Sequence, residues 1–192
     1  NHLIEMDKKK YGLRAGVILA IYNFLEGNLN ICKEYLISSN KIQEIHDKNF
    51  KNEKNYHSFL SNLIDGYKNK RSNNNKKNKN LYVIGDSHSL VSHGLNIKIS
   101  GSDYSCKAIL IMGCKQWHLG NPNKNQYKRK FEMIFDDIPK NSHVLLTIGE
   151  IDCRINDGIL KHKKKKLLNY VKPLIHSTIE NYINYICKIN FV

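Results

Sequence analysis

Apolar residues recur at helical spacing along the first third of the chain. Two stripes keep the i, i+3/i+4 rhythm of a helix face. The first stripe is Leu13, Val17, Ile21 and Phe24, and the second is Ile31, Tyr35 and Leu36. Because Glu26-Gly27-Asn28 separates them, the pattern predicts two short helices in an αα-hairpin over residues 3–39. A third amphipathic helix is predicted over residues 53–67.

The pattern stops at residues 68–80, KNKRSNNNKKNKN, which contain no apolar residue. Such a segment cannot join a hydrophobic core, so a solvated linker is predicted. The chain is therefore expected to hold a helical segment over residues 1–67, the linker, and a second domain over residues 81–192.

From residue 81 onward, short apolar runs alternate with helical patterns. Strands are predicted at 81–84, 107–112, 143–148 and, at the end of the chain, 189–192. Helices are predicted over 125–135 and from Pro173 onward, since proline suits a helix's first turn. This alternation favours an α/β fold, with a parallel sheet covered by helices on both faces.

Three of these strands end at a glycine: Gly85, Gly113 and Gly149. In a parallel sheet these ends share one rim, which is where ligands bind. Ser87, two residues after the first strand, would open a helix at this rim. Backbone N–H groups around such a serine can stabilise a developing oxyanion. A plain turn is the alternative for Gly85-Asp86-Ser87.

These blocks resemble the SGNH (GDSL-like) hydrolase family over residues 81–192. The resemblance implies a flavodoxin-like three-layer α/β/α fold and hydrolysis of esters, often acyl groups on sugars or lipids. It places the nucleophile at Ser87 and an oxyanion-hole N–H at Gly113. Gly149-Glu150-Ile151-Asp152 stands where the family has Gly-x-Asn-Asp.

Two departures from the family pattern matter. Ile151 replaces an asparagine that donates to the oxyanion, and one lost donor costs on the order of 10²–10³ in rate. No Asp-x-x-His follows Asp152, although this motif supplies the family's histidine base. We expect a fragment with an incomplete sheet, in which a histidine beyond Val192 would accept the proton of Ser87.

Charged and polar residues beside the strand ends are candidates for substrate binding: Asp86, His88, Glu150, Asp152 and Arg154. Arg154 is expected either to hold a substrate carboxylate or to pair internally with Asp152. His88 is expected to line the pocket or to cap the helix start. It is not expected to be the base for Ser87, because neighbouring side chains diverge.

Trp117 and His118 follow the second strand and suit either a sugar-stacking wall or ordinary packing. The run Lys161–Lys166 is interpreted as a solvated loop, with contact to an anionic polymer as the alternative.

The residues Gly16, Ala20 and Phe24 and the turn at Gly27 resemble one tetratricopeptide repeat. This resemblance would make the helical segment a contact for a protein partner. A helical cap for the next domain is the alternative.

Composition narrows the functional classes. The net charge of +14 suits a nucleic-acid partner, but only four arginines are present, and base readers favour arginine. We therefore expect no nucleic-acid binding.

The five cysteines form no C-x-x-C pair, which indicates reduced thiols in a cytoplasmic protein. No metal, cofactor or membrane span is expected, and a phosphate-binding P-loop is absent.

The leading hypothesis is a serine ester hydrolase that acts on O-acyl esters of carbohydrate. The alternative is a non-catalytic module of the same fold that binds a glycan or a protein partner.

Overall fold

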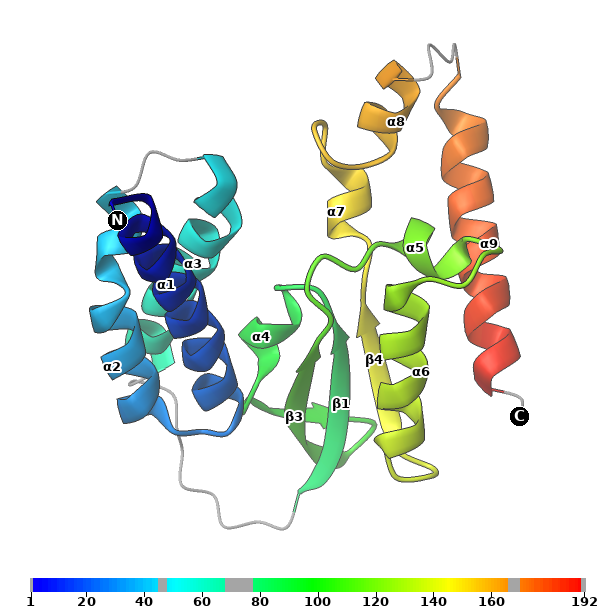
Figure 1. The fold of residues 1–192 in the computed structure, drawn as a ribbon. Coiled ribbons are helices and arrows are strands. Elements are labelled where there is room, and N and C mark those ends of the chain that lie inside the picture. The colour runs from blue at the N-terminus through cyan, green and yellow to red at the C-terminus, as the bar shows by residue number, and fades with distance from the viewer. Residues whose placement is uncertain (1, 45–47, 68–77, 166–169, 191–192) are drawn as a thin grey trace. The chain divides into compact units, whose positions relative to one another are not determined.

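The computed structural model describes residues 2–44, 48–67, 78–165 and 170–190. The chain divides into two compact units, residues 1–76 and 77–192 (Figure 1). The division falls inside the predicted linker, of which residues 68–77 lie outside the described part. Its end was placed two residues too late, because the first strand already begins at Lys79.

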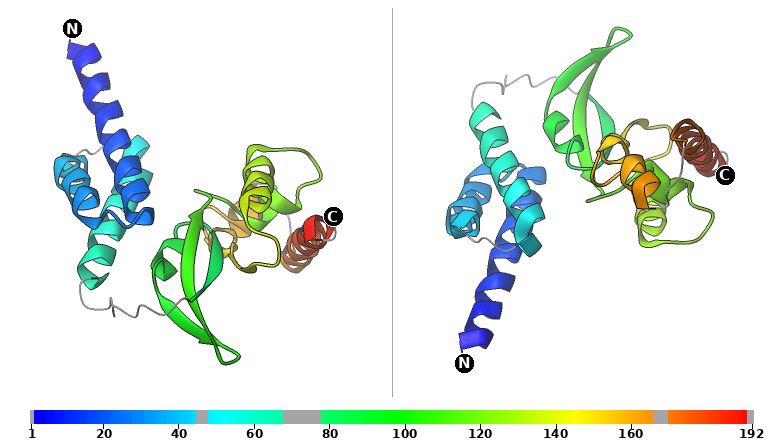
Figure 2. Two further views of the ribbon diagram at one scale, coloured as in Figure 1. Left: turned by 90° about the horizontal axis from the view of Figure 1, so that it is seen from below. Right: turned by 90° about the horizontal axis from the view of Figure 1, so that it is seen from above.

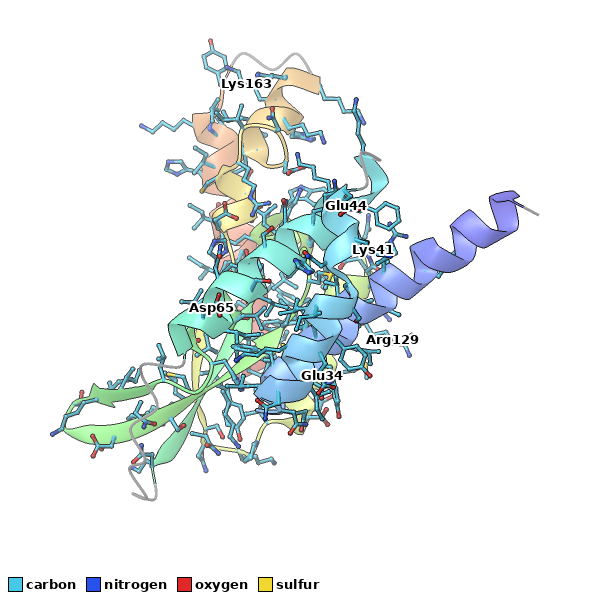
Figure 3. The ribbon with its side chains drawn as sticks, turned by 90° about the vertical axis from the view of Figure 1, so that its left-hand side faces the viewer. Glu34, Lys41, Glu44, Asp65, Arg129 and Lys163 are labelled. Carbon is cyan, nitrogen blue, oxygen red and sulfur yellow. The ribbon has the colours of Figure 1, made fainter. Side chains whose placement is uncertain are left out.

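The first unit is built from helices α1 (His2–Leu25), α2 (Leu29–Ser38) and α3 (Lys51–Tyr67), with two short 3-10 turns, η1 (Asn40–Glu44) and η2 (Lys48–Phe50). The predicted hairpin and third helix are confirmed. Its core takes one face of each helix, including Phe24, Leu36 and Leu60, all buried. Charged side chains such as Glu34 and Asp65 project outward (Figure 3).

The second unit contains a four-stranded sheet in the order β2-β3-β1-β4. Its strands are β1 (Lys79–Gly85), β2 (Asn96–Ile99), β3 (Ser102–Leu110) and β4 (His143–Thr147). β1 lies in the centre and pairs in parallel with β3 and β4. β2 pairs antiparallel with β3, so the prediction of an all-parallel sheet is wrong at this edge.

The antiparallel edge arises from a tight turn that the sequence reasoning overlooked. Ser100 and Gly101 join β2 to β3, and both have positive φ, 48° and 82°. Two such residues form the turn whose twist matches a β-hairpin. Ser-Gly between alternating apolar and polar residues was the available signal.

Helices α5 (Gln116–Gly120), α6 (Gln126–Asp137) and α9 (Lys172–Asn190) flank one face of the sheet. The core there joins residues of a strand, of two helices and of the loops that follow β3 and β4: Ile84, Ile111, Cys114, Leu119, Phe131 and Ile148. The single turn α4 (Ser89–Ser92) lies on the opposite side of the sheet from α6 (Figures 1 and 2). Leu145 is 47% exposed there, so helices cover the two faces unequally.

The predicted fourth strand at 189–192 is wrong for its first half, because α9 continues through Asn190. Tyr182, Tyr185, Ile186 and Ile189 pack against the core at helical spacing. Residues 191–192 lie outside the described part. Among the helices that the structure describes, none is long and apolar enough to cross a membrane.

Candidate active site at the carboxyl ends of the strands

The carboxyl ends of β1, β3 and β4 meet at one edge of the sheet, as predicted. Gly85, the last residue of β1, pairs with Leu110 of β3 and with Thr147 of β4. A Cβ on Gly85 would lie 2.6 Å from the Thr147 carbonyl oxygen, so a side chain does not fit there. Glycine therefore lets β4 approach the end of the central strand closely.

The turn after β1 is held together by the Asp86 side chain, which is fully buried. Its Oδ1 accepts hydrogen bonds from the His88 backbone N–H and the His88 Nδ1–H, each at 2.9 Å. The Asp86 carbonyl accepts from the Ser89 N–H and hydroxyl, at 3.0 and 2.8 Å. Ser87 is half-buried within this turn, two residues before the start of α4.

The His88 imidazole is half-exposed and fixed through one nitrogen. Because Nδ1 faces the Asp86 carboxylate, Nε2 is the nitrogen left to accept a proton or hold a ligand. Among the described residues, no hydrogen bond joins His88 to the Ser87 hydroxyl. That these neighbouring side chains diverge stays a prediction.

Glu150 and Arg154 complete the charged side of the rim from α7 (Glu150–Cys153) and the residue after it. Glu150 Oε2 lies 3.9 Å from His88 Nδ1. Arg154 contacts Glu150 through Nε at 2.9 Å and through Nη2 at 2.7 Å. This bidentate pair lowers the pKa of Glu150, chiefly through the Arg154 hydrogen bond. Arg154 thus pairs with Glu150, and the expected pairing with Asp152 is wrong.

Three of these groups gather closely enough to share a cation. Asp86, His88 and Glu150 each offer a ligand atom within 4.8 Å of the others. The buried Asp86 Oδ2 also lacks a hydrogen-bond donor among the described residues. Arg154 already supplies a positive charge to Glu150, however, and competes with a metal ion. Sequence reasoning missed this grouping, because the three residues lie on two segments far apart in the chain.

Asp152 has a different environment from Glu150, although both lie on α7. It is buried, and its carboxylate accepts the backbone N–H groups of Gln116 at 2.7 Å and Trp117 at 3.3 Å. These N–H groups begin α5, so Asp152 ties α7 to that helix. Burial raises the pKa of Asp152 against the opposing effect of these hydrogen bonds. With both oxygens occupied, Asp152 is a structural residue here, and not an available ligand for substrate.

Gly113 and Gly149, the two other glycines predicted at this rim, follow β3 and β4. Both have positive φ, 73° and 143°, in the region that favours glycine. Ile151, in the place of the family asparagine, is 8% exposed and has no donor to offer. The Gln116 amide lies against Gly149 and donates from Nε2 to the Ile148 carbonyl at 2.9 Å. That bond uses one of its two N–H groups, and sequence reasoning did not consider this residue.

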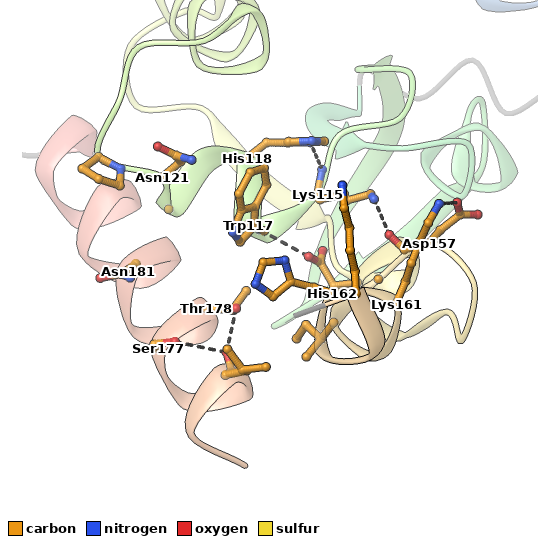
Figure 4. A pocket seen from close by; sticks show the side chains of 17 residues that line it. Lys115, Trp117, His118, Asn121, Asp157, Lys161, His162, Ser177, Thr178 and Asn181 are labelled. Carbon is orange, nitrogen blue, oxygen red and sulfur yellow. Dashed lines mark hydrogen bonds and ion pairs between the residues drawn. The ribbon is translucent and has the colours of Figure 1, made fainter. Parts of the chain in front are cut away.

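A pocket of about 390 Å³ lies between α5, α8 (Ile159–Lys165) and α9 (Figure 4). Among its described lining residues are Trp117 and His118 from α5, but neither Ser87 nor His88. The candidate nucleophile therefore does not line this pocket. His88 was expected to line the pocket of the candidate site, but it does not line this pocket.

Comparison of the chain with protein-family models, with curated proteins and with solved structures found no match. The structure itself shows an α/β unit with a mixed sheet, preceded by a helical unit.

Proposed function

We propose that the second unit is a serine ester hydrolase of the SGNH type, acting on O-acyl esters of carbohydrate. The position of Ser87 carries this proposal. The serine follows the central strand β1 directly, and its neighbours β3 and β4 end beside it. β3 and β4 lie on opposite sides of β1, so the order of the strands reverses direction here. In open α/β sheets, ligands bind at such a point.

The strand order supports the flavodoxin-like architecture that this family has. Counted along the chain, the three parallel strands are β1, β3 and β4, and in space β1 lies between the other two. This is the order 2-1-3 with which the flavodoxin-like arrangement begins. The β2 hairpin is an addition at the outer edge of β3.

In the proposed reaction, the Ser87 oxygen attacks the acyl carbon and its proton passes to a base. The alcohol, here a sugar hydroxyl, leaves with a proton, and water then hydrolyses the acyl-serine. The backbone N–H groups of Ser87 and Gly113 would hold the oxyanion. The Gln116 amide is the donor that we assign in place of the missing asparagine, because it lies at Gly149 on the same rim.

Hydrolysis by Ser87 also requires a base that accepts the proton of its hydroxyl. In the resembled family, it is the histidine of Asp-x-x-His, and reading the coding sequence beyond Val192 tests for that motif directly. The Asp86–His88 pair shows that a histidine at this rim can be oriented by a buried carboxylate.

The decisive experiment is Ser87→Ala in the full-length protein, assayed with p-nitrophenyl acetate and with an acetylated oligosaccharide. Loss of the nucleophile should lower kcat by a factor on the order of 10³ or more. Ser92→Ala is the matched control, because its hydroxyl lies in α4 and, within the described part of the chain, donates to the Ser89 carbonyl at 2.7 Å. Full activity in Ser87→Ala, with an unchanged circular dichroism spectrum, would show that Ser87 is not the nucleophile.

A second candidate function is a binding module without catalysis, and Ile151 favours it. The apolar side chain sits where the family needs a hydrogen-bond donor, and it is buried. In this case, wild type and Ser87→Ala would both lack ester turnover and would bind the same glycan or protein.

We further propose that the helical unit acts as a tetratricopeptide-like contact for a protein partner. Gly16 supports this likeness, because it allows α1 to pack closely against Ser39 at the end of α2. The exposed apolar side chains of α1, such as Ile18 and Tyr22 at 58% each, provide a contact face.

A further inference from the structure

The pocket between α5, α8 and α9 is separate from the rim that carries Ser87. Its volume of about 390 Å³ lies within the range of small-molecule sites, and both aromatic and charged side chains line it. Trp117, in the first turn of α5, is 49% exposed. A large aromatic side chain that faces a pocket half-exposed is available to stack on a ligand.

At the aromatic end of the pocket, neighbouring residues hold the His118 ring in place and favour its neutral form. His118 stacks on Tyr127, with ring centroids 3.9 Å apart, and its Nδ1 accepts the Lys115 N–H at 3.1 Å. Burial and the charge of Lys115 lower the pKa of His118 to about 4. Trp117 packs edge-on against this fixed ring at 5.4 Å. In Figure 4, the His162 imidazole lies between Trp117 and Thr178.

The polar wall and the opposite end of the pocket supply hydrogen-bonding groups of both kinds. The Ser177 and Thr178 hydroxyls donate to the Leu174 carbonyl, so their oxygen lone pairs remain as acceptors. Lys115 and Lys161 provide donors at the other end, beside Asp157 (Figure 4). A ligand with several hydroxyl groups and an apolar ring face matches this combination of donors, acceptors and indole.

The charge of the lining narrows the ligand further. The N–H groups that begin α5 are already bonded to Asp152, so an acidic ligand must be recognised by the lysines. Among the lining residues that the structure describes, the lysines Lys115, Lys161 and Lys165 against the aspartates Asp152 and Asp157 leave one excess positive charge. One excess charge suits a monoanionic carboxylate better than a dianionic phosphate.

We infer that this pocket binds a sugar acid, a hexuronate unit held by Trp117 stacking and by the lysines of α8. The inference concerns binding alone and holds whether or not Ser87 is a nucleophile. Trp117 is the single tryptophan of the chain, so its fluorescence reports directly on the pocket.

The test is a fluorescence titration of the full chain with D-glucuronate, D-glucose and glucose 6-phosphate. Glucuronate should change the Trp117 emission saturably, with a Kd at least about fivefold below that of either other sugar. In the double variant Lys161→Gln/Lys165→Gln, the Kd for glucuronate should rise about three- to tenfold. The Kd for glucose should change less than about twofold.

Lys164→Gln is the matched control, because this exposed lysine lies on α8 but does not line the pocket. Three outcomes would overturn the inference. They are no saturable change with glucuronate, equal or tighter binding of the other two sugars, and an effect of Lys164→Gln as large as that of the double variant. None of them bears on ester turnover, so this test and that of Ser87 fail independently.

Discussion

Asp152→Asn tests whether this carboxylate is a structural tie between α7 and α5. An asparagine keeps one carbonyl oxygen, which can still accept the Gln116 N–H now 2.7 Å from Oδ2. The Trp117 N–H, now 3.3 Å from Oδ1, would face an NH₂ group and lose its acceptor. An unsatisfied donor costs about 1–3 kcal/mol, and relief of the buried charge offsets part of that. We expect the free energy of unfolding at pH 7 to fall by about 1–2 kcal/mol.

The pH dependence gives a sharper test, because the pKa of Asp152 is raised in the folded state. Between the unfolded and folded pKa values, the native state binds more protons than the unfolded chain does. The stability of the wild type therefore falls as pH rises through the folded pKa and grows as pH drops toward about 4. Asp152→Asn cannot titrate there, so the advantage of the wild type should widen as pH decreases from neutral.

The assay is urea unfolding at pH 7, 5 and 4, followed by Trp117 fluorescence, which reports on the second unit alone. At pH 7 the midpoint should drop by about 0.5–1 M. Asp157→Asn is the control, because that aspartate is exposed and lies 3.9 Å from Lys161. Its variant should stay within about 0.5 kcal/mol of the wild type. An unchanged midpoint for Asp152→Asn at pH 7 would refute the structural role, and a wild-type advantage that shrinks as pH falls would refute the raised pKa of Asp152.

Two further predictions concern packing. Gly85→Ala should lower the stability of the second unit by about 1–3 kcal/mol in urea unfolding, since its Cβ would press on the Thr147 carbonyl. Gly66→Ala in α3 meets nothing within 4 Å and should instead raise helix stability by up to about 1 kcal/mol, measured by circular dichroism; equal effects would refute the contact argument. With Ellman's reagent, two thiols should react quickly in the native protein, Cys153 and Cys187. Burial raises the pKa of Cys32 to about 11 and of Cys114 to about 12, so rapid reaction of more than two thiols before urea is added would contradict the packing.

Several features followed from local pattern because they depend on neighbours in the chain. The stripe around Phe24 predicts a helix face whichever element it packs on, since helical spacing repeats along one segment. The apolar run that ends at Gly85 predicts a buried strand for the same reason. Parallel pairing then brings Gly85, Gly113 and Gly149 to one rim, which the register confirms.

Other features were misjudged where two local signals compete. Ile189, Phe191 and Val192 are β-branched or aromatic, which favours a strand. The spacing of Ile189 with Tyr182 and Tyr185 fits a helix, and packing on the core decides for the helix. Ser100-Gly101 is the opposite case. This dipeptide correctly indicates a hairpin, but no hairpin was predicted there.

The amino-acid sequence by itself determined the helical hairpin, the central strand and the placement of Ser87 just after it, because these rest on the spacing of apolar residues and on turn chemistry. Only the tertiary structure decided which charged groups meet. Glu150 and Asp152 stand two residues apart, yet one faces Arg154 and the other the first N–H groups of α5. Side chains two apart on a helical turn point in different directions, so their partners come from whichever segments pack on each side. The pocket beside Trp117 has the same origin, because α5, α8 and α9 form it together.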